Sequence, residues 1–118
     1  MRKILLLSLL GICLAVFSAP QPTVSLTMAV VKVTAYSHTG RTASGVRVQP
    51  GVVALSRDLE RTLDMQFGEK VNLEGLGTFT FHDRMARSKR QQADIWFKSR
   101  SKAARFGVKR NILLVKMV

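Results

Sequence analysis

Hydrophobic and polar residues alternate in several short segments of this chain, as they do in β-strands with one buried face. The first such segment covers residues 25–36 and is rich in β-branched side chains, which strands favour. Its alternation predicts a buried face of Ala29, Val31, Val33 and Ala35 and an outer face of Lys32, Thr34 and Tyr36. Five further strands are predicted over residues 51–55, 70–75, 78–83, 93–97 and 111–118.

Two short helices are predicted between the strands. The first begins after Ser56, which suits a helix N-cap, and ends at Gly68 with an apolar stripe of Leu59, Leu63 and Phe67. The second covers residues 102–106, with Ser99 or Ser101 as its cap and Gly107 at its end. Most connections are too short for repeated crossover helices, so the order of elements favours a small closed β-barrel over a parallel sheet.

The first 18 residues have the pattern of a secretory signal peptide. A basic start precedes an uncharged run over 4–17, which is shorter than the roughly 20 residues of a membrane-spanning helix. Val16 and Ser18 place small side chains three and one residues before a cleavage site. We therefore expect export after removal of residues 1–18, and an uncleaved membrane anchor is the alternative. Residues 19–29 are then a linker and the start of the first strand, and residues 30–118 form one domain.

Charge is the strongest compositional feature of the chain. Its 118 residues include 19 Lys and Arg against 7 Asp and Glu, a net charge of +12. Eleven of the basic residues lie from Arg84 onward, where the sequence has a single acidic residue, Asp94. This distribution predicts either an anionic partner or a solvated basic surface. Nucleic acid is the weakest candidate partner, because export is expected and few aromatic side chains accompany the basic ones.

Two aspartates are the candidate catalytic groups. Asp94 lies within an apolar strand and shares a face with Trp96, so partial burial should raise its pKa and suit it to general acid catalysis. An ion pair with an Arg is the alternative, and Trp96 is a candidate platform for stacking a sugar ring. Asp83 lies eleven residues earlier, and a hairpin-like connection would bring both carboxylates together, as in glycoside-cleaving sites. His38 and His82 are expected in surface or packing roles, and a single Cys leaves little for a metal site.

An ordered set of short motifs resembles the 3D (three-aspartate) domain family. Its opening is similar to V-T-A-Y at 33–36, T-A-S-G at 42–45 and P-G-V-V-A at 50–54. The middle, over 67–77 (FGEKVNLEGLG), is similar to the family's G-x-x-V-x-I-x-G-x-G segment. Asp83, the D-I-W-F run from Asp94, and the segment 103–107 resemble its end. The resemblance covers roughly residues 30–118.

The resemblance implies a six-stranded double-psi β-barrel, the fold of membrane-bound lytic transglycosylase A, rare lipoprotein A and the expansins. It also implies a peptidoglycan glycan substrate, cut between N-acetylmuramic acid and N-acetylglucosamine without water to leave a 1,6-anhydro product. Asp94 matches the family's catalytic acid/base and Asp83 the preceding aspartate. Two positions depart from the family: Ser56 stands where the first aspartate is expected, and the residues after Asp83 (R-M-A) replace a Thr-Gly-Gly turn.

We therefore expect an all-β protein with small α content that acts as an exported lytic transglycosylase in the periplasm, the cell envelope or outside the cell. The expected catalytic residues are Asp94 and Asp83, and the expected substrate-binding residues are Thr34, Tyr36, Trp96, Arg84, Arg87, Lys89 and Arg90. Such a reaction requires no metal and no cofactor. The expected partner is peptidoglycan. The protein is expected to be a monomer that is not stably inserted in a membrane once the signal peptide has been cleaved. A non-catalytic peptidoglycan-binding module is the alternative.

Overall fold

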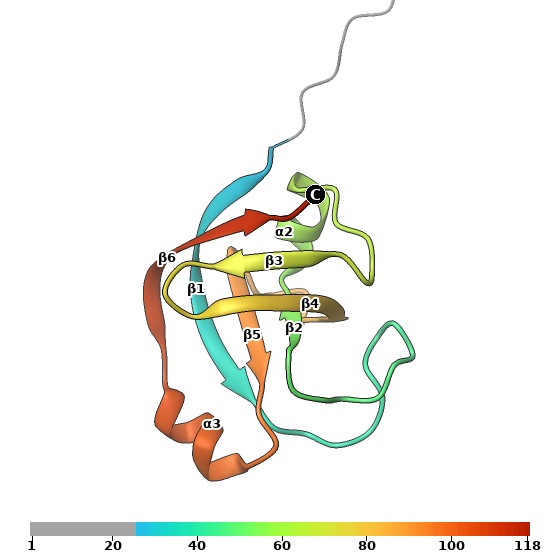
Figure 1. Cartoon of the computed structure of the whole chain (residues 1–118), viewed down its shortest axis with the longest axis vertical. Helices are drawn as coiled ribbons and strands as arrows, with labels where there is room; N and C mark the ends of the chain where they lie inside the picture. The colour runs from blue at the N-terminus through green and yellow to red at the C-terminus, as the bar shows by residue number, and fades with distance from the viewer. Residues whose placement is uncertain (1–25) are drawn as a thin grey trace, which may run out of the picture.

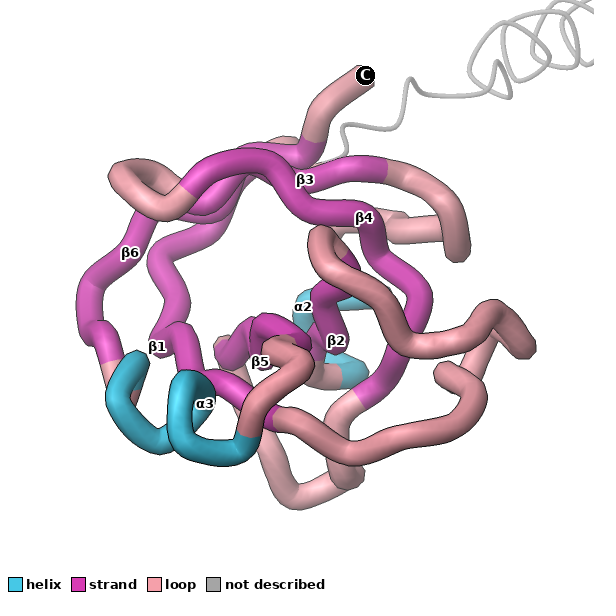
Figure 2. Tube along the Cα trace, turned by 60° about the horizontal axis from the view of Figure 1, so that its bottom comes forward, coloured by secondary structure: helices cyan, strands magenta, loops and turns pink. Residues whose placement is uncertain are grey.

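The computed structural model describes residues 26–118, so the predicted signal peptide and part of the predicted linker lie outside the described residues. Six β-strands close into a barrel in the order β1-β5-β2-β4-β3-β6 (Figures 1 and 2). They are β1 (Met28–Tyr36), β2 (Val52–Leu55), β3 (Lys70–Leu73), β4 (Gly77–Arg84), β5 (Gln92–Trp96) and β6 (Lys109–Lys116). Two helices, α2 (Arg57–Thr62) and α3 (Arg100–Phe106), lie toward opposite ends of the barrel in Figure 1. Neither of these described helices has the length and hydropathy needed to cross a membrane.

The strand pairs give the barrel two similar halves. β1 pairs with β5 in parallel, and β4 pairs with β2 in parallel. The antiparallel pair β2–β5 joins these two parallel pairs, while β3 and β6 pair with each other on the other side of the barrel. This arrangement confirms the expected double-psi barrel. The order of strands and helices along the chain is the order that the hydrophobic pattern predicts.

Alternate strand residues fill the barrel interior. In β1, Val31 and Val33 are buried while Lys32, Thr34 and Tyr36 remain partly exposed, as the period of two predicts. The other members of the described core are Val53, Leu55, Leu59, Leu63, Met65, Val71, Leu73, Phe81, Ala93, Ile95 and Leu114. Every member of this core lies after the predicted signal peptide and linker, so a chain without that peptide retains the whole barrel.

The first helix is shorter than the prediction. α2 ends at Thr62, because Asp64 adopts a left-handed backbone conformation with φ of 48°. Leu59 and Leu63 are buried, as the apolar stripe predicts. Phe67 also packs against the core, but it does so from the loop that follows the helix. The spacing of these three side chains therefore predicted correctly that they pack into the core, but it overestimated the length of the helix.

The caps of the two helices differ from each other. Ser56 precedes α2 as predicted, yet its side chain makes no capping hydrogen bond. Its Oγ instead accepts a hydrogen bond from the backbone N–H of Gln92 at 3.1 Å, which ties β2 to the start of β5. Ser99 does cap α3, where its Oγ accepts from the N–H of Lys102 at 3.3 Å. Gly107 ends α3, as the sequence predicts.

Candidate active site

Two aspartates from different strands share one pocket on the outer face of the barrel. Asp94 lies in β5 and Asp83 near the end of β4, and Ala54 of the intervening β2 pairs with both. The pocket has a volume of about 240 Å³ and is lined by Tyr36, His38, Ala54, Asp83, Arg84, Met85, Ala86, Lys89 and Asp94. The expected hairpin-like connection between the acids is wrong, because β2 separates β4 from β5. The two acids instead line the pocket from the strands on either side of β2, and Ala54 of β2 lies between them.

A β-bulge turns Asp83 toward this pocket. Phe81 and Asp83 pair with consecutive residues of β2, so His82 is an extra residue in β4. Strict alternation would place Asp83 on the same face as Phe81, which is fully buried in the barrel core. His82 is partly exposed, and its Nδ1 forms a hydrogen bond with Oγ of Ser44 in the 37–50 loop at 3.0 Å.

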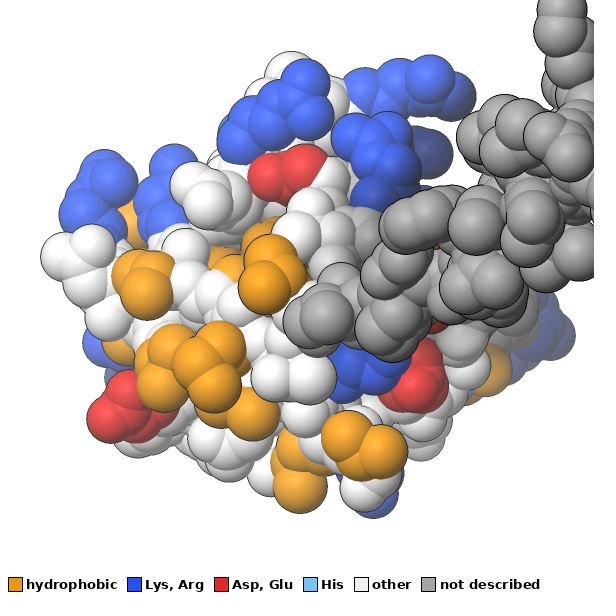
Figure 3. Space-filling view, turned by 90° about the horizontal axis from the view of Figure 1, so that it is seen from above, with side chains coloured by type: hydrophobic (Ala, Val, Ile, Leu, Met, Phe, Trp, Pro, Cys, Tyr) orange, Lys and Arg blue, Asp and Glu red, His pale blue; other side chains and the backbone are white. Residues whose placement is uncertain are grey.

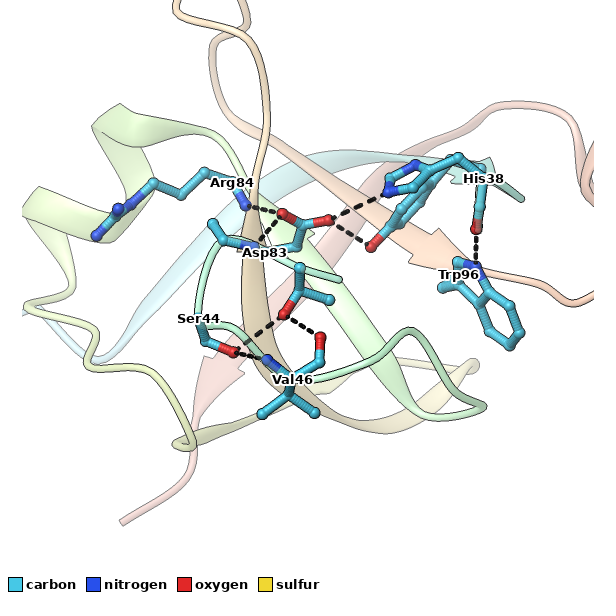
Figure 4. A network of polar contacts seen from close by, with 9 residues as sticks. His38, Ser44, Val46, Asp83, Arg84 and Trp96 are labelled. Atoms are coloured by element: carbon cyan, nitrogen blue, oxygen red, sulfur yellow. Dashed lines mark hydrogen bonds and ion pairs between the residues drawn. The ribbon is translucent and has the colours of Figure 1, made fainter. Parts of the chain in front are cut away.

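Asp83 is held by several directed contacts, which Figure 4 shows. Its Oδ1 accepts hydrogen bonds from the backbone N–H groups of Ala43 and Arg84, each at 3.0 Å. Its Oδ2 accepts from the Tyr36 hydroxyl at 3.0 Å and lies 4.0 Å from Nε2 of His38. The Asp83 side chain is only 12% exposed. These contacts fix the position of the carboxylate and suit it to act as a stationary negative charge.

Asp94 is half-buried and has fewer partners. The Thr34 hydroxyl donates to its Oδ1 at 2.9 Å, and no described residue forms a hydrogen bond with its Oδ2. Burial raises the pKa of Asp94 above its ordinary value, the Thr34 hydrogen bond lowers it in part, and the charge of Asp83 raises it further. No Arg within residues 26–118 forms an ion pair with Asp94, so the salt-bridged alternative is wrong for this part of the chain.

Tyr36 is the last residue on the polar face of β1, and His38 follows in the loop beyond the strand. Their rings lie 4.8 Å apart between centroids, and both line the pocket. Burial, followed by the neighbouring Asp83, raises the pKa of the Tyr36 phenol, which therefore remains a hydrogen-bond donor. His38 is exposed and packs against Tyr36, in line with the surface or packing role expected for it, and it also lies beside Asp83. The sequence contains a signal for this position, because Thr34, Tyr36 and His38 are polar residues at alternate positions.

Trp96 does not line the pocket that holds the two acids. It shares the outer face of β5 with Asp94, as predicted, but its side chain is buried and its residue is only 8% exposed. Its indole N–H donates to the carbonyl of His38 at 2.8 Å. Trp96 instead lines a separate, largely apolar pocket of about 380 Å³ beside α3. In this conformation it supports the loop that carries His38 and offers no open ring face beside Asp94.

The four basic residues predicted to bind substrate occupy different surroundings. Arg84 and Lys89 line the pocket, Arg87 is exposed on the same loop, and Arg90 lines another depression. The Arg84 guanidinium is engaged, since its Nε and Nη2 donate to Glu60 at 2.7 and 2.6 Å. The positive charge of Lys89 partly lowers the pKa of Asp94. Lys89 is therefore the cation best placed to attract an anionic group to the acids.

The pocket combines groups suited to moving one proton. A half-buried acid with a raised pKa can donate a proton near neutral pH and then accept one. A second carboxylate with a fixed position can stabilise positive charge that develops on a substrate. Among residues 26–118, no group of three or more His, Cys, Asp or Glu side chains is placed to hold a metal ion.

Asp94→Asn is expected to raise the thermal stability at neutral pH. The folded-state pKa of Asp94 is raised, so the folded state binds more protons and stability falls as pH rises from about 4 through the raised pKa. Asn removes the buried charge, and its Oδ1 can still accept from Thr34. The Tm of the variant should exceed that of the wild type at pH 7, and the difference should shrink at acidic pH. A difference that is the same at both pH values would contradict this account.

Comparisons with known proteins identify the fold and no family. No family model matches the sequence, and no curated protein matches it. Among solved structures, the Streptomyces papain inhibitor (SPI) is similar, with a TM-score of 0.59 at 17% sequence identity. The similarity covers 77% of this chain and 94% of the inhibitor. At this identity the likeness shows a shared architecture alone, a closed six-stranded barrel of the double-psi type.

Proposed function

We propose that this protein is an exported enzyme of the 3D domain family that cleaves peptidoglycan glycan as lytic transglycosylases do. The observation that carries this proposal is the convergence of Asp94, Asp83, Thr34 and Tyr36. These are the positions at which the sequence resembles the family, and they come from three different strands. Two hydrogen bonds join them in acid–hydroxyl pairs, Thr34 with Asp94 and Tyr36 with Asp83.

Asp94 acts first as an acid and then as a base. Its carboxyl proton passes to the glycosidic oxygen as the bond to C1 of N-acetylmuramic acid breaks. The resulting carboxylate takes the proton of the C6 hydroxyl on the same sugar, whose oxygen closes on C1 to form the 1,6-anhydro ring. The proton on Asp94 is thereby restored and no water is consumed. The fixed charge of Asp83 stabilises the positive character of the sugar in the transition state.

A peptidoglycan-binding module without turnover is the second candidate, and the surroundings of Ser56 favour it. Ser56 replaces the first family aspartate, is fully buried, and has its Oγ occupied by the N–H of Gln92. Among the residues after Asp83 that replace the family's glycine turn, Arg84 is paired with Glu60 and Met85 is nearly buried. These differences alter the surroundings of the acids and leave the pocket itself in place.

Incubation of the wild-type protein with purified sacculi separates the two candidates. Co-sedimentation measures binding, and mass spectrometry of the soluble fraction measures anhydromuropeptides. Release of anhydromuropeptides supports the enzyme. Binding without release would instead support the peptidoglycan-binding module. The absence of both binding and release would overturn a peptidoglycan function.

Basic residues beside the pocket are expected to strengthen sacculus binding. Arg87→Gln with Lys89→Gln should weaken binding roughly ten-fold at low ionic strength, since each exposed contact contributes up to about 1 kcal/mol. The effect should fade at physiological salt, where exposed charges are screened within about 8 Å. Arg100→Gln with Arg105→Gln on α3 removes the same charge elsewhere and serves as the control. Equal weakening in both double variants would assign the binding to net charge alone.

A further inference from the structure

Exposed hydrophobic side chains gather at the end of the barrel where β1 begins and β6 ends. Met28 pairs with Val115 at this end, and the N–H of Lys116 donates to the carbonyl of Thr27 at 2.7 Å. Most of the large hydrophobic side chains that are exposed in residues 26–118 lie on these segments, namely Leu26, Met28, Val30, Met117 and Val118. Figure 3 views this end and shows hydrophobic side chains beside Lys and Arg side chains. Apolar surface gathered in this way is typical of an interaction site.

A depression that contains three cations adjoins this apolar surface. It has a volume of about 300 Å³ and is lined by Val30, Val31, Lys32, Arg90, Gln91, Arg110 and Asn111, with no carboxylate among them. Within the described part of the chain, Lys32, Arg90 and Arg110 form no ion pair. Three positive charges around one depression repel one another, so a bound anion would stabilise the arrangement.

A β-bulge brings two of these cations together. Lys32 of β1 lies opposite two residues of β6, Arg110 and Asn111, at the point where the register shifts. Asn111 has a left-handed backbone conformation with φ of 55°. Like charges on facing strands are unfavourable. The bulge therefore places Lys32 and Arg110 at one depression, where a bound anion would interact favourably with both.

We propose that the outer face of β1, from this end of the barrel to the adjoining depression at Lys32, is a peripheral docking surface for an anionic phospholipid membrane. A headgroup phosphate occupies the depression between Lys32, Arg90 and Arg110, while Met28 and Val30 enter the interfacial layer. The alternation of β1 supports this pairing, because Met28, Val30 and Lys32 share its outer face. A second copy of the chain is a poor occupant, since a symmetric contact would bring the same three cations together. The proposal does not depend on the function of the Asp94 pocket.

Vesicle binding tests the proposal. The chain beginning at Ala19 contains the whole described barrel, and its binding is measured by co-sedimentation with phosphatidylcholine vesicles and with mixed phosphatidylcholine–phosphatidylglycerol vesicles. We expect binding to the anionic vesicles only. Lys32→Gln/Arg90→Gln/Arg110→Gln should weaken it roughly 100-fold, because each basic residue near an anionic surface contributes about five-fold. Met28→Ser/Val30→Ser should also weaken it, roughly ten-fold.

A charge-matched triple variant serves as the control. Lys98→Gln/Lys102→Gln/Arg105→Gln removes the same charge around α3, toward the other end of the barrel, from exposed side chains. Equal losses in the two triple variants would overturn the proposal, as would the absence of binding to anionic vesicles. Inorganic phosphate is the soluble probe. Saturable phosphate binding that the first triple variant abolishes, without vesicle binding, would assign the depression to a soluble anion and overturn the membrane surface.

Discussion

Asp94→Asn is expected to lower anhydromuropeptide release from purified sacculi by about 10²–10⁴-fold, the usual range for loss of a general acid–base group. Asn has nearly the same size, and its Oδ1 can accept the Thr34 hydrogen bond, so the geometry of the pocket should persist. The amide neither gives nor takes the proton that the reaction requires. Sacculus binding by the variant should therefore remain close to that of the wild type.

An exposed aspartate provides the matched control for this experiment. Asp64 lies in the loop after α2 with a left-handed backbone, which Asn tolerates well, so Asp64→Asn should change neither release nor folding. Circular dichroism of each variant verifies the barrel. A folded Asp94→Asn protein with wild-type release would show that the mechanism is wrong.

The strands of the barrel could be predicted from sequence because their alternation reflects burial directly. Val31 and Val33 point into the core and Thr34 and Tyr36 point out, as a period of two requires. The predicted chain order is also the observed order. The short connections and the order of elements favour a closed barrel, as observed. The order in which the strands pair could not be obtained in this way, because periodicity does not specify which strands pair. The double-psi arrangement came from the resemblance between motifs, and the topology confirms it.

The candidate site was less predictable, because it depends on departures from regular strands. Asp83 faces the pocket because His82 is an extra residue in β4, and alternation alone does not reveal such a residue. The buried state of Trp96 depends on a carbonyl in the 37–50 loop, 58 residues away in the chain. Arg84 is likewise neutralised by a long-range partner, Glu60. Sequence identified these residue types as candidates, while their partners required the three-dimensional structure.

Asp83→Ala should have the largest effect on stability among the site variants, a loss of about 2–4 kcal/mol of unfolding free energy at neutral pH. Alanine leaves three donors without their acceptor, the N–H groups of Ala43 and Arg84 and the hydroxyl of Tyr36. One of them, Ala43, belongs to the 37–50 loop, which should therefore loosen first. Urea unfolding measures the global loss, and amide hydrogen exchange at Ala43 measures the local one.

Asp83→Asn separates the hydrogen bonds from the charge. Its Oδ1 can still accept from both backbone N–H groups, so the loss of stability should stay within about 1 kcal/mol. Removal of the negative charge lowers the pKa of Asp94, because Asp83 is one of the groups that raise it. If Asp94 is the acid, glycan cleavage by this variant should decline at a lower pH than in the wild type. Equal destabilisation by Asn and Ala would instead show that the charge of Asp83, and not its hydrogen bonds, holds the loop against the barrel.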